Sequence, residues 1–97
     1  MTVLHLRSIG PNDYSVLEDR REIGRIRYAK ERTPGLWLWH VTVTLPGPPF
    51  GDAKSIGEAK DRFKTAWFAF KAKQATDDLK RAFDAMAYAN RPGRFAR

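Results

Sequence analysis

The alternation of side chains from Leu36 to Leu45 constrains the fold of this chain more than any other part of the sequence. In an extended backbone, successive side chains point to opposite sides. One side of this stretch then carries Trp37, Trp39, Val41, Val43 and Leu45. The other side carries Leu38, His40, Thr42 and Thr44. Two indole rings and three aliphatic side chains require a large apolar cover, so we predict a half-buried strand in the middle of a small core.

The length and composition allow one small domain. A chain of 97 residues with 42% hydrophobic residues can bury one compact core. We assign this domain to residues 1–90, followed by a basic, flexible tail at residues 91–97. Without cysteine, the chain has no disulfides, thiolate zinc sites or cysteine nucleophiles. No signal peptide or apolar run of membrane-spanning length is visible, so we expect a cytoplasmic protein without membrane contact.

Three further segments before the Trp-rich strand have strand-like alternation. Val3–Ile9 predicts a first strand, and Tyr14–Glu18 with Glu22–Tyr28 predicts a hairpin. A glycine inside a strand, here Gly24, marks a bulge or the close approach of an aromatic ring. A Trp of the following strand is the candidate for that ring.

The segment after the Trp-rich strand, Pro46–Gly51, contains three prolines. Because proline lacks the backbone N–H and fixes φ, we predict a crossing loop that forms neither strand nor helix. Phe50 is expected to pack against the core from this loop.

A helix is predicted to begin at Ser55, because Ser55 and Glu58 form a capping box. Its apolar residues recur at spacings of three and four, which is typical of a helix packed on a sheet. The stripe comprises Ile56, Ala59, Phe63, Ala66, Trp67 and Phe70. We expect it to cover the face that carries Trp37 and Trp39.

A second apolar stripe, Leu79, Phe83 and Met86, falls roughly on the opposite side of the same helical projection. Either the helix breaks near Thr76, where Asp77 and Asp78 suit a new helix start, or one helix continues. A continuous helix would expose the stripe in a monomer and so predicts self-association as a homodimer. We favour two helices.

The predicted fold class is therefore α+β. It consists of a small antiparallel sheet of three or four strands, packed on one face by a long C-terminal helix. A second helix, or an extension of the first, follows.

No catalytic arrangement is visible in the sequence, and we predict that the protein is not an enzyme and has no metal or other cofactor. His5 and His40 lie in predicted strands without a second ligand at metal-binding spacing. Asp77 and Asp78 are explained by helix capping. Phosphate-binding glycine motifs are missing as well.

Basic residues are the main functional candidates. The chain carries 18 Lys and Arg against 11 Asp and Glu, a formal charge of +7, of which +6 lies in residues 54–97. A sheet face not covered by the helix would present Arg25 and Arg27 beside His40, with Arg20 and Arg21 at the hairpin tip. Arginines on an exposed sheet can enter a DNA groove, although charged strand faces also serve solubility alone.

Five motifs in this order resemble a family of small, uncharacterised alphaproteobacterial proteins. They are Gly24-Arg25-Ile26, Trp37-x-Trp39, Gly51-x-Ala53, Glu58-Ala59-Lys60 and Phe63 to Trp67. The resemblance covers residues 14–70 and implies no activity.

The order of sheet and helix is also similar to two kinds of DNA-binding domain. These are the plant ethylene-response-factor type and the arm-binding domain of phage integrases. The matching residues are Glu58-Ala59 and the hairpin arginines, whereas the DNA-reading Trp and Arg pattern of the plant domain is not reproduced. This resemblance implies a sheet that faces DNA.

Two functions follow as hypotheses. The first is a module that binds DNA or RNA through Arg20, Arg21, Arg25, Arg27 and His40. The alternative is a protein-interaction or self-association module that uses Leu79, Phe83 and Met86.

Overall fold

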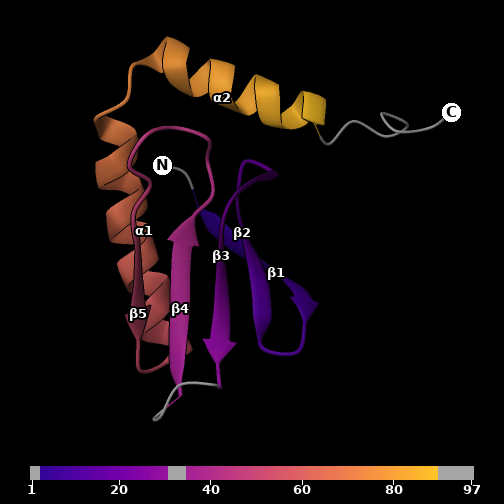
Figure 1. The fold of residues 1–97 in the computed structure, drawn as a ribbon, viewed down its shortest axis with the longest axis vertical. Coiled ribbons are helices and arrows are strands. Elements are labelled where there is room, and N and C mark those ends of the chain that lie inside the picture. The colour runs from indigo at the N-terminus through magenta and orange to yellow at the C-terminus, as the bar shows by residue number, and fades with distance from the viewer. Residues whose placement is uncertain (1–2, 31–34, 90–97) are drawn as a thin grey trace, which may run out of the picture.

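The structure, a computed structural model that describes residues 3–30 and 35–89, has five antiparallel strands and two helices in this part of the chain (Figure 1). The elements are β1 (Leu4–Gly10), β2 (Asp13–Glu18), β3 (Arg21–Ala29), β4 (Leu36–Val41), β5 (Phe50–Ala53), α1 (Ile56–Ala72) and α2 (Thr76–Ala89). The strands lie side by side in chain order. The predicted α+β class is confirmed, but the sheet has five strands, not three or four. The basic tail predicted for residues 91–97 lies outside the described residues.

The strand that the sequence did not predict is β5, whose residues pair antiparallel with β4. The prediction of a loop through Gly51 was therefore wrong for Phe50 and Gly51, because the last proline is Pro49 and pairing becomes possible after it. Gly51 lies opposite Trp39, and a Cβ on Gly51 would be only 2.7 Å from Cζ2 of the indole. The missing side chain thus makes room for Trp39.

The Trp-rich strand is shorter than predicted. β4 ends at Val41 and the chain bends after it, although Val43 remains fully buried. In the strand order β1-β2-β3-β4-β5, the middle strand is β3, and β4 lies between β3 and β5. A tight turn in which the Leu45 N–H donates to the Val43 carbonyl, at 2.8 Å, ends the extended conformation.

Short turns connect the first three strands. The β1–β2 turn is Pro11-Asn12, where Asn12 has the positive φ of 54° that suits asparagine. The β2–β3 turn is Asp19-Arg20, with φ of 52° and 67°, as expected for a two-residue hairpin turn. The hairpin prediction is confirmed.

A bulge in this hairpin changes the predicted faces. The register shifts between Val16 and Leu17, so that Ile23 of β3 has no partner on β2. Ile23 is fully buried in the core, although strict alternation along β3 would place it on the side of Arg25 and Arg27.

Helix α1 covers one face of the sheet, as the apolar stripe predicts. The Ser55 hydroxyl accepts from the Glu58 N–H at 3.1 Å, which confirms the N-cap. The buried residues of α1 are Ala59, Phe63, Trp67 and Phe70. In Figure 1 the helix runs behind β4 and β5, and the sheet's other face is turned away from it.

The ring that lies over Gly24 belongs to Phe63 of α1, so the prediction of a Trp from the next strand was wrong. A Cβ on Gly24 would overlap this ring and lie 2.5 Å from the His40 carbonyl oxygen. Trp39 packs edge-on against the same Phe63, with ring centroids 6.1 Å apart. Helix and sheet are thus in contact at a glycine backbone.

A buried carboxylate ties the hairpin to the end of α1. Glu18 is 4% exposed, and its carboxylate accepts from Trp67 Nε1 at 2.9 Å and from Lys71 Nζ at 3.1 Å. Hydrogen bonds and an opposite charge offset the cost of removing a carboxylate from water. Lys71 therefore contributes to the stability of the core.

The two-helix alternative is confirmed, since α1 ends at Ala72 and α2 begins at Thr76. Helix α2 turns away from α1 and crosses the upper end of the sheet in Figure 1. It buries Ala82, and Phe83 and Met86 pack in part against the core. The stripe that a continuous helix would expose is thus partly covered by the chain itself.

The Gly24–Phe63 contact generates a stability prediction. Gly24→Ala should lower the free energy of unfolding by about 2 kcal/mol, because overpacking forces the ring or the strand to move. Urea unfolding followed by tryptophan fluorescence measures this difference. The control is Gly57→Ala, where the nearest atom to the new Cβ is 4.0 Å away and alanine favours the helix. Equal stability of Gly24→Ala and the unmodified protein would contradict the contact.

Candidate functional site

The sheet face opposite α1 is the candidate site, and we call it the open face. Strand register places on it, among others, Arg7, Asp13, Ser15, Glu22, Arg25, Arg27, Leu38, His40, Phe50 and Asp52. The side chains of the opposite face, among them Val16, Ile26 and Trp39, are buried beneath α1. Of the two sheet faces, the open face is therefore the one that a ligand can reach.

Three of the predicted nucleic-acid-binding residues meet on the open face. Arg25 lies directly opposite His40 in the β3–β4 pair, and Arg27 lies opposite Leu38. Partial burial lowers the pKa of His40 below 6.5, and the positive charges of Arg25 and Arg27 lower it further. The two arginines therefore disfavour a positive charge on the His40 imidazole.

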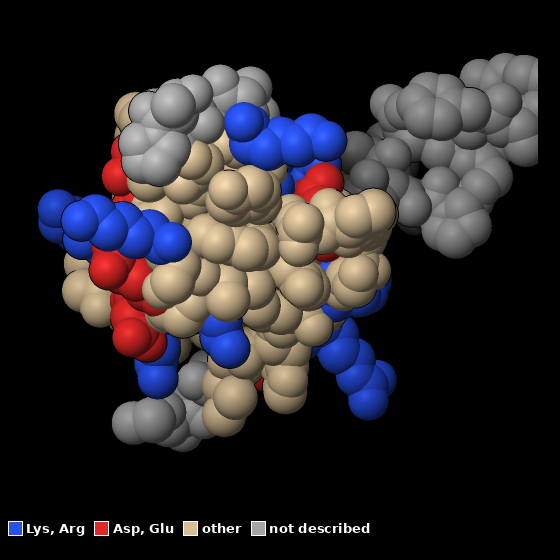
Figure 2. Space-filling view, turned by 90° about the horizontal axis from the view of Figure 1, so that it is seen from below, with Lys and Arg blue, Asp and Glu red and all other residues tan. Residues whose placement is uncertain are grey.

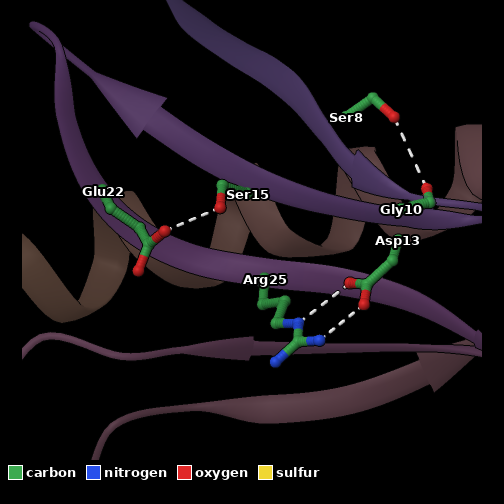
Figure 3. Close-up of polar contacts among 6 residues, drawn as sticks. All are labelled: Ser8, Gly10, Asp13, Ser15, Glu22 and Arg25. Carbon is green, nitrogen blue, oxygen red and sulfur yellow. Dashed lines mark hydrogen bonds and ion pairs between the residues drawn. The ribbon is translucent and has the colours of Figure 1, made fainter.

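Arg25 is held by a carboxylate from β2 (Figure 3). Its Nε and Nη2 donate to the two carboxylate oxygens of Asp13, at 2.8 and 2.5 Å. This bidentate pair lowers the pKa of Asp13, with the Arg25 hydrogen bonds as the largest cause. The sequence did not reveal Asp13, because the pairing depends on the register between β2 and β3.

Acidic residues share the open face with the arginines. The Glu22 carboxylate accepts from the Ser15 hydroxyl at 2.6 Å (Figure 3), and its Oε1 lies 4.0 Å from Nη2 of Arg7. Asp52 follows Phe50 on the same side of β5. The three arginines of this face are thus accompanied by three carboxylates.

Basic side chains also do not gather at the lower end of the molecule. Figure 2 shows this end with uncharged residues at its centre, while Lys and Arg lie apart around the rim, some of them beside acidic residues. Positive charge is therefore not concentrated at the part of this end that Figure 2 shows.

The structure separates Arg20 and Arg21 from the other arginines. Arg20 is in the hairpin turn, and the Arg21 guanidinium lies over the Phe83 ring, 4.7 Å from its centroid. A hollow of about 260 Å³ is lined by both arginines and by Phe83 and Met86 of α2. Residues assigned to two different sites by sequence are therefore neighbours here. Leu79 lies one turn earlier on α2 and is half-buried.

The functional candidate that sequence reasoning missed is Phe50. We predicted it to pack against the core, but this was wrong: Phe50 lies on the open face opposite His40 and is 80% exposed. The pattern Gly51-x-Ala53 could have indicated this orientation, because the two small residues face Trp39 and Trp37. The residue before them then points away from the helix.

The described part of the chain gives no sign of a bound ion or a membrane segment. Among residues 3–30 and 35–89, no group of three or more His, Asp or Glu side chains is placed to hold a metal ion. No helix in these ranges is both long and apolar enough to cross a membrane.

Comparisons with protein-family models, curated proteins and solved structures found no match for this chain. The resemblances noted in the sequence stay predictions.

The surroundings of His40 generate a pH prediction. Its lowered pKa favours folding above about 6.5, and this contribution is lost as the pH falls through the folded-state pKa. In Arg25→Ala, the pKa of His40 should rise toward 6.5, because one of the repelling charges is gone. An NMR titration of the imidazole signals measures both values. The control Arg62→Ala removes an arginine of α1, and an equal shift in both variants would contradict the assignment.

Proposed function

We propose that this protein binds nucleic acid through the open face of its sheet. The observation that carries the proposal is the position of Arg25 opposite His40, with Arg27 two residues further along β3, on the face that α1 leaves uncovered. Guanidinium groups donate to phosphate oxygens and to base edges. The formal charge of +7 adds a long-range attraction for a polyanion.

The pairing of Arg25 with Asp13 is compatible with this function. A guanidinium has five N–H donors, and Asp13 accepts from two of the nitrogens, so that donors remain for a ligand. The carboxylate also fixes the orientation of the guanidinium, which reduces the entropy lost on binding. The Asp13 carboxylate also lowers the net positive charge of the open face. We therefore expect a modest affinity for nucleic acid that depends strongly on salt.

The test is fluorescence anisotropy with labelled single-stranded and duplex oligonucleotides, at several salt concentrations. We expect binding at low salt, and an affinity that falls steadily as salt rises because counterions are released. Arg27→Ala and Arg25→Ala should each weaken binding several-fold and make the salt dependence less steep by about one ion. Circular dichroism establishes that each variant is folded.

The matched control is the double variant Lys60→Ala, Lys64→Ala. It removes two exposed positive charges from α1, on the other side of the sheet. Its binding should stay close to that of the unmodified protein. Absence of binding at low salt would contradict the proposal, and so would an equal loss in the lysine and arginine variants.

The alternative is self-association through Leu79, Phe83 and Met86. The observation that favours it is that the three side chains are only half-buried and that Phe83 and Met86 line a hollow between α2 and the hairpin. Sedimentation velocity on the same samples separates the two functions. A dimer that dissociates in Phe83→Ser supports the alternative, and a monomer at all concentrations contradicts it.

A further inference from the structure

An exposed aromatic ring on the open face belongs to a hydrogen-bonded strand. Phe50 is 80% exposed, yet it belongs to β5 and pairs with His40. The preceding loop is attached to the sheet as well, since the Val41 N–H donates to the Pro49 carbonyl at 2.9 Å. A single exposed apolar side chain is common on protein surfaces, so the groups beside the ring decide whether it can hold a ligand.

A hollow of about 480 Å³ lies beside this ring. Leu38, His40, Pro48, Phe50 and Asp52 contribute to its lining. The lining combines apolar groups with an imidazole and a carboxylate, and the volume is in the range of sites for small ring-containing ligands. The hollow can therefore accept a flat group that covers the Phe50 ring.

The charges beside the hollow select the class of ligand. Arg25 is the strand partner of His40, and Arg27 is the partner of Leu38, so both arginines belong to the strand next to the hollow, outside its lining. A ligand that places a flat ring on Phe50 and negative charge near these arginines is complementary to both features. A nucleotide within a strand has both features.

The accessibility of the base decides between single strands and duplexes. In a duplex, both faces of each base are covered by neighbouring base pairs, so a ring on a sheet surface cannot stack on them. In a single strand, the bases can turn outward and stack on aromatic side chains. We propose that the open face binds single-stranded nucleic acid, with one unpaired base stacked on Phe50 and the adjoining phosphates near Arg25 and Arg27. This inference rests on the proposed function.

The experiment compares a 12-nucleotide single strand with a duplex hairpin, as DNA and as RNA, by anisotropy. Phe50→Ala should weaken binding of the single strand about tenfold, because stacking on the ring is lost. Binding of the hairpin should not change. Phe50→Trp keeps an aromatic ring and should retain the affinity, and base stacking should quench the fluorescence of the new indole.

Ile9→Ala is the matched control, because Ile9 is an exposed apolar side chain of β1, at the other edge of the sheet. It should leave both affinities unchanged. Equal affinity of Phe50→Ala and the unmodified protein would overturn the inference, while weaker binding by the arginine variants would still support the proposed function. Tighter binding of the duplex hairpin oligonucleotide than of the single strand would also overturn the inference. If neither the single strand nor the duplex binds, this inference and the proposed function both fail. Phe50 then becomes a candidate contact for a protein partner.

Discussion

The contact between Phe63 and the backbone of Gly24 determines how the rest of the molecule is arranged. A helix can lie this close to a strand only where the strand has no side chain, and Gly24 supplies that gap in the middle strand of the sheet. In the edge strand β5, the missing side chain of Gly51 makes room for the Trp39 indole. The two glycines hold α1 on one face and allow both rings to be buried. A single helix covers only that face, which leaves the other available for binding.

The buried Glu18 carboxylate extends this arrangement to the upper end of the sheet. Trp67 and Lys71 both donate to it from α1, so the hairpin is linked to the last turns of the helix. Removing one partner of a buried ion pair leaves an uncompensated charge, which makes this link sensitive to substitution. Near the same end, Arg21 contacts the Phe83 ring and so places α2 against the hairpin. The arginine at the strand start thus stabilises the fold rather than extending the open face.

Sequence alone predicted the elements whose pattern is local. The N-cap at Ser55, the apolar stripe of α1 and the alternation of β4 up to Val41 depend only on neighbouring residues, and each is present. The errors concern features set by tertiary contacts. The burial of Ile23 follows from a bulge, and the ring over Gly24 comes from a residue 39 positions later in the chain. No local pattern contains that information.

The candidate site was predictable to a similar extent. Alternation placed Arg25, Arg27 and His40 on one face, and the strand register confirms that they are neighbours. It could not show that Asp13 holds Arg25, because this depends on how β2 aligns with β3. The prolines before Phe50 concealed β5, and with it the exposed ring. Burial could be inferred for the Trp residues because their whole strand alternates, whereas Phe50 stands at the start of a strand of four residues.

The central claim is that the face opposite α1 is the binding surface. The most direct measurement is a titration of ¹⁵N-labelled protein with a short single-stranded oligonucleotide, followed by amide chemical shifts. The claim predicts that the largest changes occur at Arg25, Arg27, His40 and Phe50, while the exposed lysines of α1 change little. Changes concentrated on α1 or α2, or no change at millimolar oligonucleotide and low salt, would contradict it.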